Sequence, residues 1–186
     1  MNGDGAASPT TTRIDWEIDL VADLITEDPN LTQALRIEYF NPESFDIDYD
    51  PWVAADQADA IANKVGIRIG RDKELTLIAM LGDQCVGAVW STWYPDRERQ
   101  TTDDEDDVWI YDFDVVSDPT YRAAGPIGLK LIEAALDEYR HAEHPRKMIR
   151  VYVVNPKLIT YLERHYGFEN EGTYSHGAAH MTYYGG

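Results

Sequence analysis

The sequence predicts an α/β fold, in which a central β-sheet is flanked by helices. Three observations indicate this fold class. Residues 75–93 contain two β-rich runs around the turn at residues 82–84, which is the pattern of a β-hairpin. Residues 108–139 read as a strand, a glycine-bearing turn and an amphipathic helix, and residues 148–154 are again rich in β-branched side chains.

The composition is that of one globular domain. The chain has 186 residues, of which 44% are hydrophobic and 11% aromatic, enough for one sizeable core. We expect the small, polar residues 1–12 to form a disordered tail and residues 13–186 to form a single domain. No apolar run approaches the roughly 18 residues that span a bilayer, and no signal pattern is present. We therefore expect a soluble, cytoplasmic protein without a membrane partner.

The chain is strongly acidic, with 34 Asp and Glu against 16 Lys and Arg and a formal net charge of −18. This charge repels nucleic acids and anionic membranes and favours cationic ligands. A solubilising surface, such as one adapted to high salt, explains the charge without a specific role. A decoy that mimics DNA is the alternative.

No residue pattern suggests a metal site. Cys85 is the single cysteine, so an intramolecular disulfide is excluded. Its position in a predicted strand indicates a core residue. His141 and His144 lie at the end of the predicted long helix, where an imidazolium favours the negative helix terminus. His165 lies near another predicted helix end.

The N-terminal part is predicted to contain helices around a loop. Apolar residues recur at helical spacing over residues 14–24 and again over residues 31–38. Residues 39–52 alternate aromatic and acidic side chains and contain two prolines, which is loop composition. The aromatic residues there either pin the loop to the body or form a rim that holds an amine. Residues 53–65 predict a further short helix.

The segment after the hairpin, residues 94–107, is polar and ends in five consecutive carboxylates at residues 103–107. Adjacent like charges repel each other and stay solvated, which predicts a mobile loop. The alternative is that the run steers a polycation toward the strand that follows.

Asp112 and Asp114 share one face of the predicted central strand, residues 108–116. Carboxylates in so apolar a strand are costly to bury unless they are paired, hydrogen-bonded or in a wet cleft. Two explanations are open. One is a base that takes a proton from an ammonium substrate, and the other is a structural ion pair with an arginine such as Arg150 on the neighbouring strand.

The turn after this strand has features of an anion site. Pro126 suits the first position of a helix, so the helix is predicted to begin near Gly125. The small residues before it allow backbone N–H groups to point at an anion on the positive helix end. A diphosphate cradle and an ordinary loop are both consistent with this turn. After the helix, strands are predicted at residues 148–154, 171–175 and 180–184.

The order of these motifs resembles the GNAT superfamily of acyl-CoA-dependent N-acyltransferases. The resemblance rests on the block Val116, Pro119, Arg122, Gly125, followed about thirty residues later by Asn155 and then by the Tyr-Gly-Phe ending at residues 166–168. It covers the chain from about residue 75 to the C-terminus. It implies a mixed, mostly antiparallel central sheet of about six to seven strands, with helices on its faces.

Two positions depart from the family pattern. Gly125 and Gly128 lie one position further apart than the glycines of the family's turn. The family's tyrosine, the general acid for the leaving thiol, falls on Leu162, with Tyr161 just before it.

The resemblance implies an N-acetyltransferase that moves an acetyl group from acetyl-CoA to the primary amine of a cationic small molecule or a lysine side chain. Transfer would be direct, within a ternary complex, by a monomer or homodimer without a metal. A main-chain N–H at the end of the central strand would polarise the thioester carbonyl. The implied catalytic residues are Asp112, Asp114 and Tyr161. The implied coenzyme-binding residues are Val115, Val116, Arg122, Ala123, Ala124, Gly125, Ile127, Gly128 and Asn155.

Two other functions are consistent with the sequence. The altered turn and the displaced tyrosine suit a non-catalytic module that binds acyl-CoA. The net charge suits an acidic decoy or DNA mimic whose function is its surface field.

Overall fold

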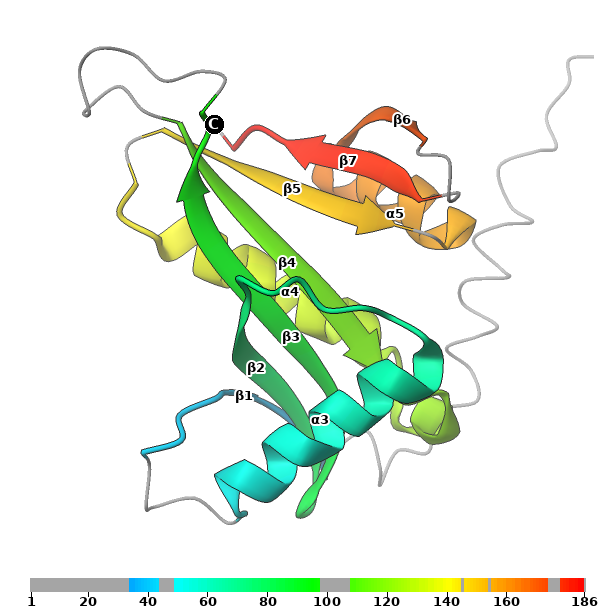
Figure 1. Ribbon diagram of the computed structural model, residues 1–186. Helices are drawn as coiled ribbons and strands as arrows, with labels where there is room; N and C mark the ends of the chain where they lie inside the picture. Colours follow the sequence, from blue (N-terminus) through cyan, green and yellow to red (C-terminus); the bar gives the residue numbers. More distant parts are fainter. Residues whose placement is uncertain are drawn as a thin grey trace, which may run out of the picture.

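The computed structural model describes residues 34–43, 49–97, 108–144, 146–153, 155–173 and 178–185. Its strands form one seven-stranded sheet in the order β1-β2-β3-β4-β5-β7-β6 (Figure 1). The strands are β1 (Leu35–Tyr39), β2 (Glu74–Leu81), β3 (Gln84–Pro95), β4 (Trp109–Ser117), β5 (Lys147–Val153), β6 (Glu169–Thr173) and β7 (Ala179–Tyr183). The β4–β5 pair is parallel and the other pairs are antiparallel. This confirms the predicted mixed, mostly antiparallel sheet.

Helices cover both faces of the sheet. They are α3 (Pro51–Val65), the short 3-10 helix η2 (Pro119–Ala124), α4 (Ile127–His141) and α5 (Pro156–Tyr166). α3 packs over β2, β3 and β4 on one face, whereas α4 and α5 lie on the other (Figure 1). The alternating side chains of β4 supply both cores, with Tyr111 and Phe113 toward α4 and Val116 toward α3.

α4 is seated on the sheet at a glycine of β3. A Cβ atom at Gly87 would lie 2.9 Å from the Val116 carbonyl oxygen, 2.9 Å from Leu131 Cδ1 and 3.0 Å from Ile127 Cγ2. Only glycine therefore lets the first turns of α4 approach β3 this closely. This contact places the N-terminus of α4 beside the end of β4.

A lysine on β5 caps the other end of α4. Lys147 Nζ donates to the carbonyl oxygens of Tyr139, Arg140 and Ala142 at 2.7, 3.0 and 2.9 Å. These are carbonyls that a helix leaves without partners at its C-terminus.

Most predicted elements are confirmed with small changes at their ends. The hairpin and the helix over residues 53–65 are present, and Cys85 is buried, which raises the pKa of its thiol to about 11. β6 and β7 begin two residues and one residue earlier than predicted. Pro126 occupies the N-cap position of α4 rather than the first helical position.

Two predictions were wrong. The helix expected over residues 31–38 is replaced from Leu35 onward by β1, which pairs with β2. Leu35, Ile37 and Tyr39 alternate with polar residues there, and a strand gives their backbone groups partners at the sheet edge. His144 does not cap α4, because its ring lies 4.6 Å from both the Trp93 and the Trp109 rings.

One further prediction is supported, and three others concern residues that the structure does not describe. His141 Nδ1 lies 2.8 Å from the Asp137 carbonyl oxygen, as a cap of α4 would. The predicted tail, the helix over residues 14–24 and the acidic run 103–107 lie outside the described residues. Within those residues, no helix has the length and apolar character needed to cross a membrane.

The close approach of α4 to β3 can be tested by replacing each of two glycines with alanine. We expect Gly87→Ala to lower the free energy of unfolding by about 2 kcal/mol, because the Val116 carbonyl cannot move aside without distorting β4. Gly128→Ala is the matched control, since its Cβ would meet only Ser117 Oγ at 3.5 Å. Urea unfolding measures both variants. Equal stability of the two variants would contradict the close approach at Gly87.

Candidate active site

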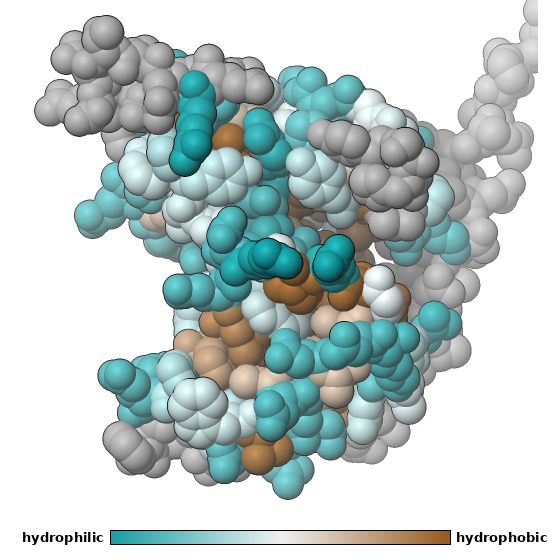
Figure 2. All heavy atoms as spheres, in the orientation of Figure 1, coloured by the Kyte–Doolittle hydropathy of each residue, from teal (hydrophilic) through white to brown (hydrophobic). Residues whose placement is uncertain are grey.

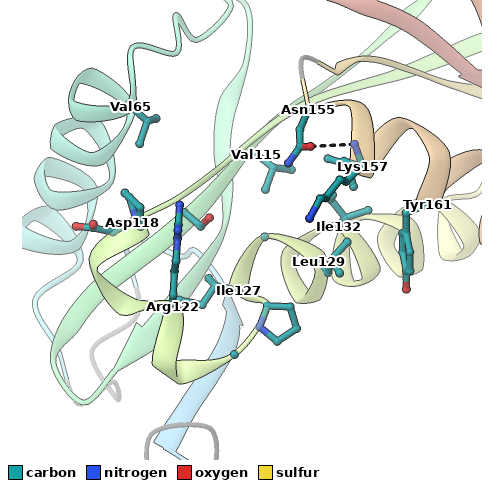
Figure 3. Close-up of a pocket in the computed structure, with 16 residues that line it drawn as sticks. Val65, Val115, Asp118, Arg122, Ile127, Leu129, Ile132, Asn155, Lys157 and Tyr161 are labelled. Atoms are coloured by element: carbon teal, nitrogen blue, oxygen red, sulfur yellow. Dashed lines mark hydrogen bonds between the residues drawn. The ribbon is translucent and has the colours of Figure 1, made fainter. Parts of the chain in front are cut away.

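A cavity of about 690 Å³ lies where β4 and β5 part. The two strands pair only from Trp109↔Lys147 to Asp112↔Arg150, and β4 then continues to Ser117 while β5 continues to Val153. Their divergence is visible in Figure 1. We call this opening the split, and the Asp112–Arg150 pair its vertex. The end of β4, η2 and the first turns of α4 and α5 surround the cavity (Figure 3).

The split leaves one edge of β4 open. β3 pairs with β4 along its whole length, up to Gly87↔Ser117. On the other side, no strand of the described part of the chain pairs with β4 beyond Asp112. Backbone N–H and C=O groups on that edge are therefore available to a ligand, because strand edges present unpaired donors and acceptors.

The first turn of α4 faces the cavity without a side-chain cap. Asp50, Asp118 and Asn155 cap α3, η2 and α5 through their side chains, whereas Pro126 at the start of α4 makes no such hydrogen bond. No acidic residue lies in this first turn. The helix dipole and the N–H groups of the first turn thus favour an anion here.

Two cationic residues and a glycine with positive φ lie beside the first turn of α4 at the cavity. Arg122 on η2 and Lys157 on α5 both line it, as Figure 3 shows. Gly125 has φ 99°, a conformation that side chains disfavour, and its carbonyl accepts from Ile127 N at 2.9 Å. The dashed line in Figure 3 is the hydrogen bond from Lys157 N to Asn155 Oδ1, 3.0 Å long. Asn155 thereby fixes the start of α5 at the cavity wall.

The structure brings together most of the predicted coenzyme-binding residues. Six of them line the cavity: Val115, Arg122, Gly125, Ile127, Gly128 and Asn155. The side chains of the other three do not. Val116 points into the core under α3, Ala124 is buried under α4, and Ala123 is exposed away from the cavity lining.

Further residues that line the cavity were not predicted from the sequence. Val65 of α3, Asp118 and Leu129 are examples, and Ile132 and Leu158 add apolar surface. The Asp118-Pro119 pair, a cap residue before a proline, marks the start of η2 and was the available signal.

Asp112 and Asp114 lie on the opposite face of β4 from the cavity, and a lysine bridges them. Lys73 Nζ donates to Asp112 Oδ1 at 2.7 Å and contacts Asp114 Oδ2 at 2.9 Å. Gly70 N also donates to Asp114 Oδ2, at 3.2 Å. The side chains of Lys73, Asp112 and Asp114 are only 7%, 15% and 21% exposed. The carboxylates are therefore paired, but with a lysine that was not predicted from the sequence.

The segment 66–73 carries this lysine across the sheet. It leaves the end of α3 and passes in front of β4 and β3 before β2 begins (Figure 1). Figure 2 shows this face, where hydrophilic residues gather over the middle of the sheet beside exposed apolar ones. Arg150, the partner suggested by the sequence, lies opposite Asp112 in register and hydrogen-bonds the Tyr94 side chain.

Burial raises the pKa of Asp112 above its ordinary value, and the hydrogen bond and charge of Lys73 oppose that rise. Asp112 belongs to the last β4–β5 pair, so it stands at the vertex of the split. A carboxylate at this point borders the opening between the two strands. Its proton affinity, raised by burial, suits a group that accepts a proton.

Tyr161 lines the cavity from α5, on the other face from the two aspartates. In Figure 3 it lies at the end of the cavity away from Asp118 and Val65. Its ring packs 4.5 Å from His165 and 5.8 Å from Tyr166, and the neighbouring Leu162 is buried in the core. The structure thus places the predicted acid within the cavity but does not bring it into contact with the predicted bases.

A second lysine–aspartate pair joins α3 to the cavity. Lys64 Nζ donates to Asp118 Oδ1 and Oδ2 at 2.8 and 3.0 Å and to Thr120 Oγ1 at 2.8 Å. The hydrogen bond from Lys64 lowers the pKa of Asp118. The end of α3 is thereby tied to η2. Among the described residues, no group of three or more His, Cys, Asp or Glu side chains is arranged to hold a metal.

Comparisons with known proteins agree with this architecture. The model of the acetyltransferase (GNAT) family matches residues 30–168. NAA60 of Arabidopsis thaliana in complex with acetyl-CoA superimposes with a TM-score of 0.56 at 13% identity, over 81% of this chain and 99% of that chain. The same protein with a bisubstrate analogue gives 0.53 at 12% identity, over 82% and 99%.

A bacterial structure gives a similar result. The GNAT-family acetyltransferase of Streptococcus pneumoniae has a TM-score of 0.52 at 16% identity, over 81% of this chain and 99% of that chain. At these identities the structural likeness establishes the fold alone. A comparison with curated protein sequences found no match. The family predicted from the motifs is confirmed by the match over residues 30–168.

Proposed function

The chain belongs to the acetyltransferase (GNAT) family, and on that premise we propose that it transfers an acetyl group from acetyl-CoA to a primary amine. The observation that carries the proposal is the split, where an open strand edge lies beside an uncapped helix N-terminus. The first can pair with the amides of an extended pantetheine arm, and the second can bind its diphosphate. The bound acetyl-CoA in Arabidopsis NAA60 supports this choice of co-substrate.

In this proposal the diphosphate lies on the first turn of α4. The backbone N–H groups of Gly128 and Leu129 would donate to its oxygens, and Arg122 and Lys157 would supply positive charge. The pantetheine arm would follow the open edge of β4 toward the vertex. A main-chain N–H near Val115 would then polarise the thioester carbonyl, because a fixed donor stabilises the developing oxyanion.

The amine acceptor would reach the thioester through the split from the α3 face. Asp112 is the preferred base, because it stands at the vertex and is largely buried. It would take the proton of the ammonium group, directly or through water, and the free amine would attack the thioester carbonyl. The tetrahedral intermediate would expel the coenzyme thiolate and lose its second N–H proton to water. Tyr161 is the candidate to protonate that thiolate, and it would regain its own proton from solvent.

The alternative functions make different predictions in two simple assays. A transferase is stabilised by acetyl-CoA in thermal unfolding and releases free thiol when an acceptor amine is added. A non-catalytic acyl-CoA-binding module is stabilised but releases no thiol with any amine. An acidic decoy shows neither effect.

The diphosphate site can be tested at Gly128. A side chain there has room in the fold but would stand between the backbone donors and the diphosphate. We expect Gly128→Val to weaken acetyl-CoA binding by about tenfold or more, because hydrogen bonds to a charged group contribute about 1.5–3 kcal/mol each. Isothermal titration calorimetry measures the affinity, and thermal unfolding without ligand is the control for folding. Unchanged affinity in a folded Gly128→Val variant would show that the diphosphate binds elsewhere.

The base can be tested by neutral substitutions of the two aspartates. We expect Asp112→Asn to lower kcat by about 100- to 10,000-fold, which is the usual contribution of a general base. Asp114→Asn should cost less, since Asp114 Oδ2 already accepts from Gly70 N and contacts Lys73 Nζ, which leaves it less free to take a proton. The affinity for acetyl-CoA should be unchanged in both variants, because the two side chains lie on the face of β4 opposite the cavity. Full activity in both variants would mean that water or another residue removes the proton.

The class of acceptor follows from the charge of the chain. The net charge of −18 raises the local concentration of cations, so we expect a polyamine, an aminoglycoside or a lysine side chain to be preferred over an α-amino acid. The ratio kcat/KM for a polyamine should fall as salt rises, since exposed charges are screened beyond about 10 Å at 0.1 M. The measurement compares a polyamine with a monoamine before and after replacing the five acidic residues at 103–107 with Ser and Asn. An unchanged preference would leave the acidic run as a solubility feature.

A further inference from the structure

Lys73 is a nearly buried cation with no role in the chemistry described above. Its side chain is 7% exposed, and its ammonium group lies between Asp112 Oδ1 and Asp114 Oδ2. Lysine is rarely buried without a partner, because removing an ammonium group from water costs several kcal/mol. The two carboxylates offset that cost, so this position specifically requires a cation.

The contacts of Lys73 restrict how both carboxylates can move. Asp112 and Asp114 are two residues apart on β4, so their side chains project from the same face. One ammonium group spans them, and the Gly70 N–H fixes Asp114 from the same segment. The segment 66–73 therefore holds the two carboxylates at the vertex of the split.

The environment of Asp112 contains charged or titratable groups from every element around it. Asp114 shares its strand, Tyr94 belongs to β3, Arg150 to β5 and His180 to β7. Burial raises the pKa of the Asp112 carboxyl most, and the neighbouring Asp114 charge raises it further. Lys73 lowers it through both a hydrogen bond and its charge, and Arg150 lowers it through charge.

We propose that Lys73 is a positioning residue for the catalytic base: it orients the Asp112 carboxylate at the vertex and keeps it ionised, with Asp114 as its second anchor. This inference rests on the proposed function, in which Asp112 is the base. Without the ammonium group, the two carboxylates would repel each other and Asp112 would hold a proton to higher pH. A protonated Asp112 cannot accept the proton of the acceptor amine.

The test is the pH profile of kcat/KM in Lys73→Met, Lys73→Arg and a matched control. Lys73→Met keeps the apolar stem and removes the charge. We call the fall of kcat/KM toward low pH the acidic limb, and we expect this limb to move to higher pH in the variant. We expect kcat to fall by about tenfold, less than the loss of the base itself. Lys73→Arg restores the charge and should return the limb toward its wild-type position.

Lys64→Met is the matched control, because Lys64 forms the other lysine–aspartate pair near the same segment. It removes the partner of Asp118 at the cavity, so it should alter the KM for acetyl-CoA. The acidic limb should stay where it is in the wild type. A shift of the limb in both variants would mean a general effect of lost positive charge and would overturn the proposal.

A second measurement does not depend on turnover. Carbon-13 NMR titration of the aspartate carboxyls should show a higher Asp112 pKa in Lys73→Met than in the wild type. Since that pKa then lies further above the unfolded value, the variant should lose stability as pH rises and recover it on acidification. Thermal unfolding across pH tests this sign and confirms that the variant folds.

Each result decides between distinct alternatives. An unmoved acidic limb and an unmoved Asp112 titration in folded Lys73→Met would make Lys73 a structural residue only. A higher kcat/KM for cationic acceptors in Lys73→Met would mean that Lys73 competes with the substrate ammonium, which also overturns the proposal. If the wild type transfers no acetyl group to amines, the proposed function fails. The NMR titration then still shows whether Lys73 controls the ionisation of Asp112.

Discussion

The split between β4 and β5 is the constraint on which the site depends. β5 is fixed by its own pairing with β7 from Ile149 to Val153, and β4 is fixed by β3 from Trp109 to Ser117. Closing the split would break these outer pairs, so the open edge of β4 is maintained by the rest of the sheet. A donor on such an edge is already oriented before a ligand arrives, and preorganised donors are what oxyanion stabilisation requires. The seat of α4 at Gly87 adds the helix N-terminus at the wide end of the same opening.

The end of α3 and the segment after it serve both faces of this opening. Lys64 holds η2 through Asp118, and Val65 lines the cavity. A few residues later, Gly70 and Lys73 hold the two aspartates on the other face. The proposed coenzyme loop and the proposed base therefore have a common support. A movement of this segment would affect both, and this follows from the covalent continuity of the chain rather than from a network of contacts across the core.

Much of the fold was predictable because local patterns and tertiary structure agree in it. The apolar spacing of α4 and the alternation of β4 match the faces that they bury. β1 was missed although residues 35–39 alternate, because a short stretch with Leu35 and Glu38 also fits a helical spacing. Lys73 could not be found in the sequence, because its partners lie about forty residues away and no periodic pattern marks a loop. The cavity lining was partly misassigned for a related reason, since Ala124 meets the sequence criterion for a small turn residue yet packs into the core.

The acidity of the chain and the chemistry of the site are separable. At the vertex, the two positive charges of Lys73 and Arg150 balance the two negative charges of Asp112 and Asp114. This cluster is therefore formally neutral despite the net charge of −18 for the whole chain. The Lys73–aspartate contacts are largely buried and therefore weakly screened by salt. An effect of net charge on the choice of acceptor must then come from the field of the exposed surface, which salt screens strongly. In the proposed mechanism, salt would accordingly change which amine arrives without changing how Asp112 accepts a proton.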